Sequence, residues 1–264
     1  MSLLGRLFGT EAKFAFSRRK YVDPDTLWNL AQLTRLEFDG AWLKRHGPIH
    51  DLPSHRVDEL LKKADAFNTS ANTLSQRGHG DAAIKAYERA ICAFPRSPVA
   101  YHNLCVESFK RQDQALIVLT ALTAILLCSE ATIGDYEGYK LFTWLGDGIR
   151  ELEGDRSSTA LQRLCELQPD SPGLQWCLGT DLFLRKEYER AILQFEATIQ
   201  IRRDFFLAHY DIGRCHLNLQ DWADALAAFK VALSVRPADT VGFQLGLQAE
   251  KWIAEHSSKV RPAT

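Results

Sequence analysis

The chain has 264 residues, of which 46% are hydrophobic and 25% are charged, and its formal net charge is -1. This is the composition of an ordinary globular protein that is long enough to bury a sizeable core. The near-neutral charge gives no electrostatic reason to expect a nucleic-acid partner. The six cysteines form no CxxC pair, and the N-terminal sequence lacks an uninterrupted apolar core, so we expect a cytoplasmic protein with reduced thiols.

Residues 1–21 are predicted to form a basic N-terminal arm. Its five basic side chains and one acidic side chain give a local charge of +4, and Leu3, Leu4, Leu7 and Phe8 would share one face of a helix. An amphipathic segment at a membrane surface is one interpretation, and a docked or frayed arm is the other. We favour the second, because a single short basic stretch binds membranes weakly.

Residues 22–63 are predicted to form N-terminal capping helices that cover the first exposed face of the body that follows. The loop within this segment contains His46, His50 and His55. Their spacing matches no helical pair of metal ligands, and no cysteine lies nearby in the sequence. We therefore expect solvated loop histidines and no metal site.

The rest of the chain repeats itself with a period of 34 residues in its C-terminal part. The matching pairs are Trp176 and Tyr210, Leu178-Gly179 and Ile212-Gly213, Ala191 and Ala225, and Phe195 and Phe229. Each unit contains two apolar stripes at helical spacing, separated by a short polar turn, which indicates stacked helix pairs. The predicted repeats are 64–97, 98–137, 138–171, 172–205 and 206–239, followed by a capping helix at 240–256 and a disordered tail at 257–264.

The second repeat contains an unusual segment, residues 115–128, which carries no charged side chain over its 14 residues. A membrane-spanning helix needs about 20 apolar residues, so this segment is too short. We expect it to be buried on all sides, either by the N-terminal helix or by a second copy of the chain in a homodimer.

This pattern resembles the tetratricopeptide repeat family, whose units carry a Leu-Gly pair in the first helix, then Ala, an aromatic residue and a second Ala in the second helix, then Pro. The last repeat matches at Ile212-Gly213, Ala225, Phe229, Ala232 and Pro237. The preceding repeat departs only at Thr198 and Arg203. The resemblance implies an all-α fold, a right-handed superhelical solenoid of antiparallel helix pairs that is capped at both ends.

The sequence contains no phosphate-binding glycine loop, no Gly-x-Ser-x-Gly elbow and no zinc-protease motif, so we expect no enzymatic activity and no cofactor. The resemblance implies instead a non-enzymatic adaptor or scaffold that binds a protein, a peptide or a partner helix in a concave groove. The alternative is a peripheral membrane or complex-assembly factor that uses the basic arm 1–21 and the apolar segment 115–128.

In the resembled family, the fifth position of each repeat faces the groove. Here those positions are Asn68, His102, Phe142, Trp176 and Tyr210, and four of them carry a ring that could anchor a peptide. The rings could also pack between helices as core. The predicted peptide-binding residues are Asn72, His102, Asn103, Phe142, Trp176, Thr180, Tyr210, Asp211 and Arg214.

Some family members clamp the C-terminal carboxylate of a heat-shock chaperone with basic residues and two asparagines in successive repeats. Asn72 and Asn103 have the matching offset of 31 residues. However, Asn68 occupies the slot of the first lysine, and Lys140 lies one place away from its slot. Without its cationic partners a carboxylate loses the charge-assisted bonds that make the site selective. We expect this clamp to be absent or altered.

Overall fold

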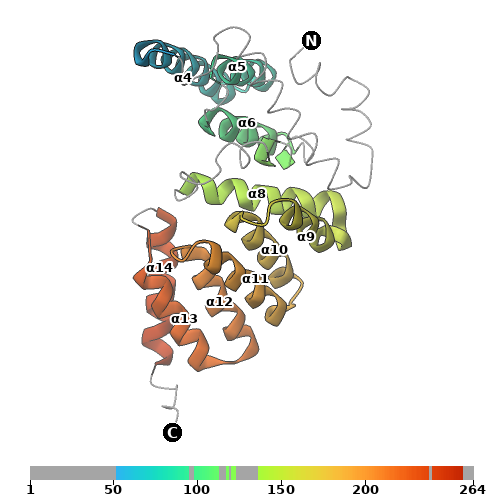
Figure 1. The fold of residues 1–264 in the computed structure, drawn as a ribbon, viewed down its shortest axis with the longest axis vertical. Helices are drawn as coiled ribbons and strands as arrows, with labels where there is room; N and C mark the ends of the chain where they lie inside the picture. Colours follow the sequence, from blue (N-terminus) through green and yellow to red (C-terminus); the bar gives the residue numbers. More distant parts are fainter. Residues whose placement is uncertain are drawn as a thin grey trace. The chain divides into compact units, whose positions relative to one another are not determined.

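The computed structural model describes residues 52–94, 98–112, 117–118, 120–122, 136–237 and 240–257. The predicted arm 1–21, most of the capping segment 22–63 and all but the first residue of the tail 257–264 lie outside the described residues. All regular elements in the described ranges are helical, so the predicted all-α fold class is confirmed (Figure 1). Within the same ranges, no helix is both long enough and apolar enough to cross a membrane.

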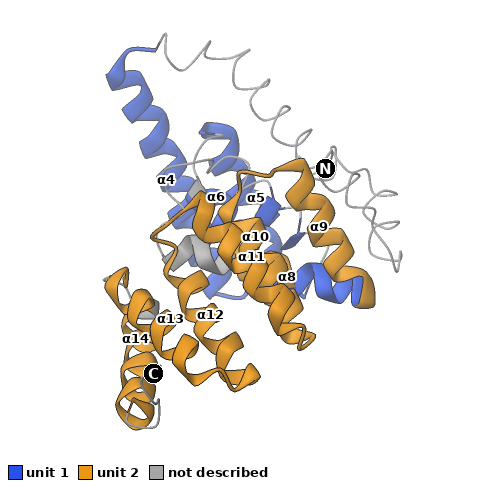
Figure 2. Ribbon diagram, turned by 60° about the horizontal axis from the view of Figure 1, so that its bottom comes forward, with its two compact units in different colours: residues 1–131, 147–154 blue, residues 132–146, 155–264 orange. Residues whose placement is uncertain are grey.

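The elements are α4 (Ser54–Gln76), α5 (Gly80–Ala93), α6 (Pro98–Lys110), α8 (Tyr136–Glu153), the 3-10 helix η2 (Gly154–Arg156), α9 (Ser157–Leu167), α10 (Pro172–Leu184), α11 (Tyr188–Ile201), α12 (Phe206–Leu219), α13 (Trp222–Ser234) and α14 (Thr240–His256). They belong to two compact units (Figure 2). Unit 1 comprises residues 1–131 and 147–154, and unit 2 comprises residues 132–146 and 155–264.

In unit 1, α4 packs on α5, α5 packs on α6, and α4 also contacts α6. The predicted boundary between the capping segment and the first repeat, at residue 64, falls inside α4. Leu60, on the N-terminal side of that boundary, shares one buried cluster with Ala64, Ala93 and Phe94. The first helix of this pair therefore extends ten residues beyond the predicted repeat, back to Ser54.

Unit 2 contains a regular succession of helix pairs. Each helix from α9 to α14 packs against the next one in the chain, and α12 also contacts both α10 and α14. The turn between α10 and α11 lies at Arg185–Glu187, as the polar interruption in the sequence predicted. Because short turns join helices that pack together, the pairs are antiparallel, and successive leading helices lie side by side. The predicted stacking of helix pairs is confirmed in this unit.

The 34-residue period has a specific packing cause. A Cβ atom added to Gly179 would lie 2.6 Å from Cε1 of Phe195, and one added to Gly213 would lie 2.7 Å from Cε1 of Phe229. Both phenylalanines are buried. In each pair, the second helix therefore presses an aromatic ring against the backbone of the first, at a point where only glycine leaves room.

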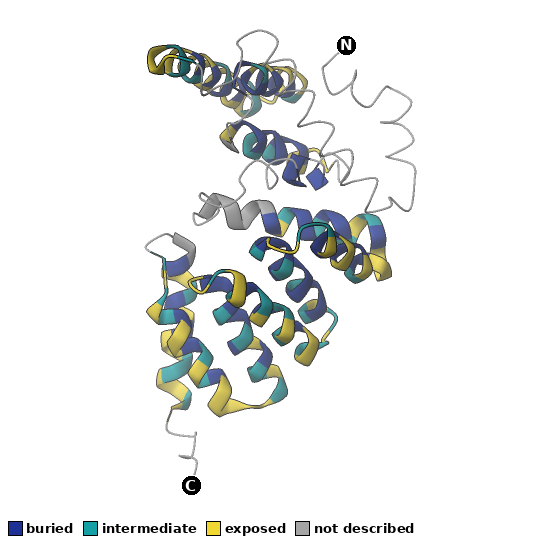
Figure 3. Cartoon of the chain, viewed as in Figure 1, coloured by how far each residue is buried: buried dark blue, intermediate teal, exposed yellow. Residues whose placement is uncertain are grey.

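Helix α10 is buried along most of its length (Figure 3). Pro172 occupies its first turn, and the Ser171 hydroxyl accepts a hydrogen bond from the Leu174 amide at 3.4 Å, which caps the start of the helix. In unit 1, the described residues of the uncharged segment 115–128, which are 117–118 and 120–122, are buried as predicted.

Candidate functional site

The leading helices of unit 2 share a connected group of polar and aromatic side chains, which we call the α10–α12 face. Its members are Trp176, Thr180 and Phe183 from α10, and Asp211 and Arg214 from α12. Trp176 Nε1 donates a hydrogen bond to Asp211 Oδ2 at 2.8 Å, and Arg214 Nη1 donates to Asp211 Oδ1 at 2.8 Å. The Arg214 guanidinium carbon lies 4.3 Å from the centre of the Phe183 ring. One carboxylate thus joins the two helices and orients the arginine.

The electrostatics of this face are set by the depth of Asp211. Its side chain is buried, and burial raises the pKa of the Asp211 carboxyl, against the lowering effects of the Arg214 charge and of the hydrogen bonds from Trp176 and Arg214. The Arg214 side chain is 44% exposed. The face therefore presents a cation to solvent above a buried carboxylate, with an aromatic ring beneath the cation.

Thr180 adds an unused hydroxyl to the same face. Its Oγ1 atom is buried, and it has no hydrogen-bond partner within the described ranges. A buried hydroxyl without a partner is costly, because it gives up its bonds to water and receives nothing in return. The atom is closed to solvent in this conformation, so a ligand group can bond to it only after a shift that exposes it.

Three of the four rings predicted at the fifth repeat positions are buried. Phe142, Trp176 and Tyr210 retain only 1%, 6% and 7% of their surface. Phe142 covers Gly173, where an added Cβ would clash with its ring, and the Tyr210 hydroxyl donates to Gln248 Oε1 at 2.9 Å. These three rings pack between successive leading helices, which is the core alternative stated above, and in this conformation they offer no ring face to a peptide.

The predicted residues of unit 1 bond to other groups within that unit. The Asn103 side-chain amide donates to Asn68 Oδ1 at 3.0 Å, and His102 Nδ1 lies 3.3 Å from Asn103 Oδ1. The Tyr87 hydroxyl donates to Asn72 Oδ1 at 2.7 Å. Both asparagines at the clamp offset are therefore engaged inside the unit, in contacts that join α4 to α5 and α6.

A common rule connects these contacts. In each unit, the fifth position of one repeat bonds to the sixth position of the next, 35 residues later. The pairs are Asn68 with Asn103, the Phe142 carbonyl with the Cys177 thiol, and Trp176 with Asp211. Positions that the sequence pattern assigned to ligand binding thus serve first to hold neighbouring leading helices together. Of the predicted residues, Thr180 and Arg214 are those of unit 2 that keep free polar capacity.

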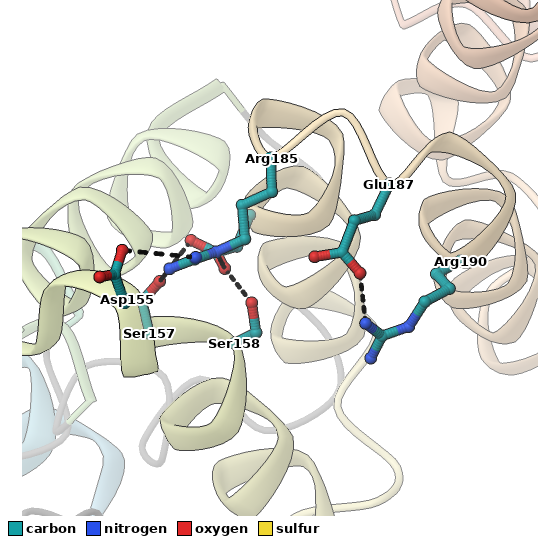
Figure 4. Close-up of polar contacts among 7 residues, drawn as sticks. Asp155, Ser157, Ser158, Arg185, Glu187 and Arg190 are labelled. Carbon is teal, nitrogen blue, oxygen red and sulfur yellow. Dashed lines mark hydrogen bonds and ion pairs between the residues drawn. The ribbon is translucent and has the colours of Figure 1, made fainter.

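Sequence reasoning missed a second polar network, around Asp181 (Figure 4). The fully buried Asp181 carboxylate accepts hydrogen bonds from the hydroxyls of Ser157, at 2.7 Å, and Ser158, at 2.6 Å, and from Arg185 Nε at 3.0 Å. Arg185 also approaches Asp155 at 4.0 Å. The signal was available, because Asp181 is the one charged residue of α10. The network fixes the start of α9 against the end of α10.

The described residues show no cluster of three or more histidine, cysteine or acidic side chains that could hold a metal ion. The free cysteines among them are Cys92, Cys105, Cys165, Cys177 and Cys215. Burial raises the pKa of the Cys105, Cys165 and Cys215 thiols to about 12, so these groups are neutral near pH 7. They act as small apolar side chains.

Comparison with known proteins identifies a repeat-containing region in the C-terminal part of the chain. A family model described as tetratricopeptide repeat matches residues 178–240. No curated protein sequence matches the chain.

A search of solved structures finds matches of low sequence identity. The crystal structure of YrrB, a TPR protein with an unusual peptide-binding site, shares 20% identity over 70% of this chain and 90% of that one, with a TM-score of 0.41. A thermophilic TPR protein of Thermus thermophilus shares 18% identity over 72% and 99%, with a TM-score of 0.47. The MamA protein shares 19% over 77% and 98%, with a TM-score of 0.40. The family model by itself confirms, for residues 178–240, the resemblance that the 34-residue period indicated.

Proposed function

We propose that this protein is a non-enzymatic adaptor that binds an extended peptide or a partner helix on the α10–α12 face. Arg214 is the proposed contact for a ligand carboxylate, and the Thr180 hydroxyl is the proposed contact for a ligand backbone group. Asp211 holds the arginine in place from below. The partner is thus expected to carry an acidic side chain or a free C-terminal carboxylate at the point that meets Arg214.

The observation that supports this proposal is that Arg214 is held in place by its neighbours and is still exposed to solvent. Its guanidinium uses Nη1 for Asp211 and rests on the Phe183 ring, yet 44% of its side chain remains in contact with solvent. An arginine has five N–H donors in a fixed plane, so a guanidinium held by one carboxylate can still bind a second one. Because Asp211 and Phe183 already restrict the side chain, little rotamer entropy is left to lose on binding.

A randomised peptide library displayed on phage tests the proposal. Selected peptides are synthesised, and their affinities are measured for the wild type, for Arg214→Gln and for the matched control Arg203→Gln, an exposed arginine outside the face. Loss of a charge-assisted hydrogen bond should weaken binding roughly 10-fold to 100-fold in Arg214→Gln. Binding should also weaken with added salt. Selected acidic peptides that bind Arg214→Gln at full affinity, or that lose equally in Arg203→Gln, contradict the proposal.

The proposal also includes the class of partner and the cellular location of the protein. We propose a protein or peptide partner and no nucleic-acid partner, which the net charge of -1 supports. The free thiols support a reducing, cytoplasmic environment. The alternative membrane or assembly role rests on residues 1–21, which lie outside the described residues, and on segment 115–128, whose described residues are buried. We also propose that the chain forms a homodimer, which a measurement of its oligomeric state in solution tests.

A further inference from the structure

Unit 2 contains a groove on the other side of α10, which we call the α9–α11 groove. It has a volume of about 390 Å³, within the usual range of ligand-binding cavities. Helices α9 and α11 form its walls, and α10 forms its floor. Each helix contributes one glutamine, namely Gln162 on α9, Gln175 on α10 and Gln194 on α11.

The three glutamine side chains reach solvent in this groove, because Gln162 is exposed and Gln175 and Gln194 are half-buried. None of their amide groups bonds to another group within the described ranges. Each primary amide has two donors and one acceptor, so the groove offers both kinds of hydrogen-bonding group on all three of its sides. By contrast, the amides of Asn68 and Asn103 in unit 1 bond to each other.

The groove carries no net charge of its own. Glu166 on the α9 wall pairs with Arg163 at 3.0 Å, and Arg190 on the α11 wall pairs with Glu187 (Figure 4). Burial raises the pKa of the Cys165 thiol to about 12, so this wall residue is neutral. Locally balanced walls give no preference for an anion such as a phosphate, and the free amides favour a neutral, hydrogen-bonding ligand.

Both walls are held in place by contacts outside the groove. The Asp181 network attaches the start of α9 to α10, because Ser157 and Ser158 lie in the first turn of α9. On the other side, the buried Phe195 ring holds α11 against Gly179. The groove therefore exists before any ligand arrives, and binding does not have to order its walls.

From these observations we infer that the α9–α11 groove binds an extended peptide segment by its main chain. An extended backbone presents N–H and C=O groups in regular succession, about every 3.3 Å, and these complement amides that can donate and accept. The floor residues Leu178 and Leu182 are only 5% and 1% exposed, so the floor offers little apolar surface to a ligand side chain. This site is separate from the α10–α12 face and goes beyond the proposed function.

The same peptide library tests the inference, with a different set of variants. The double variant Gln162→Ala with Gln194→Ala is compared with the wild type, with Gln200→Ala, an exposed glutamine of α11 outside the groove, and with Arg214→Gln. Two neutral hydrogen bonds are lost, so groove-binding peptides should bind the double variant about 30-fold more weakly. Their affinity should be unchanged in the other two variants and insensitive to salt. Circular dichroism verifies that the double variant is folded.

A second measurement tests directly whether the main chain of the bound peptide makes the contacts. A selected peptide is resynthesised with N-methylated central amides, which removes backbone donors but keeps every side chain, and its binding should fall at least 10-fold. Equal binding of the methylated peptide overturns the inference, as does a library that yields no peptide sensitive to the glutamine pair. If selected peptides depend on Arg214 alone, the proposed function stands and the groove inference fails. If they depend on the glutamines alone, the reverse holds.

Discussion

The two sides of helix α10 differ in whether their polar groups bond to other groups of the protein. On the α12 side, Trp176 bonds to Asp211, and Asp211 bonds to Arg214, so most of the polar capacity is used within the protein. On the side of α9 and α11, the amides of Gln162, Gln175 and Gln194 have no partners among the described residues. The comparison teaches that the leading-helix face is mainly built for cohesion between repeats, whereas the opposite groove has the larger unused capacity for a ligand.

The largest expected effect comes from the network that supports the groove. Asp181→Asn removes the buried charge that accepts bonds from Ser157, Ser158 and Arg185. We expect the free energy of unfolding to fall by about 3 kcal/mol, because hydrogen bonds to a charged group are the strong ones. Urea denaturation followed by circular dichroism measures the change. Binding of groove peptides should weaken as well, because α9 loses its attachment.

Asp155→Asn is the matched control for that change. Asp155 lies 4.0 Å from the same Arg185, but its side chain is fully exposed. An exposed pair contributes little, so its denaturation midpoint should stay close to that of the wild type. If the two variants behave alike, the buried network does not support the α9 wall.

A smaller loss of stability is expected from a substitution on the α12 side of α10. Trp176→Phe removes the donor at 2.8 Å from Asp211 and should lower the free energy of unfolding by about 1–2 kcal/mol. Since the smaller ring also loses packing, a double-mutant cycle with Asp211→Asn separates the hydrogen bond from the loss of volume. Affinity for groove peptides should not change. Additive stability losses in the cycle would show that the bond does not join α10 to α12.

The smallest expected effect is a pH dependence of the free energy of unfolding, which arises from Asp211 on α12. Burial raises the pKa of Asp211 above its ordinary value of 3.8, so the folded protein holds a proton there that the unfolded chain has already released. The resulting stability is fully present below the unfolded pKa and is lost as pH rises through the folded pKa. The pH profile of urea denaturation should therefore differ between the wild type and Asp211→Asn in this acid window.

Comparing the wild type with Asp211→Asn also cancels the pH-dependent stability that other titratable groups contribute. The hydrogen bond from Arg202 lowers the pKa of Asp204, which acts in the opposite direction, but it is common to both proteins. The stability of Asp211→Asn relative to the wild type should rise with pH across the window. A difference that stays flat with pH would mean that the carboxyl is not desolvated as the structure indicates.

The repeat period, the helix pairs and their turns could be predicted because each depends on local sequence. Gly179 with Phe195 and Gly213 with Phe229 repeat one packing contact, and that contact leaves a 34-residue signature. The boundary between the capping segment and the first repeat was predicted less well, because residue 64 falls inside α4. Candidate site residues were harder to predict, because the fifth position of a repeat can equally face a ligand or the next leading helix.

The sequence by itself determined that this chain consists of helix pairs and where unit 2 turns, because periodic apolar residues, glycines and capping residues act within a few turns of one another. Only the tertiary structure decided which polar groups remain available. It buried Trp176 and Tyr210, enclosed the Asp181 carboxylate, and left the three glutamines of the α9–α11 groove without partners among the described residues. The reason is physical: whether a side chain is satisfied depends on neighbours some 24 to 35 residues away, as in Ser157 with Asp181 and Trp176 with Asp211, and these neighbours meet only when the helices stack.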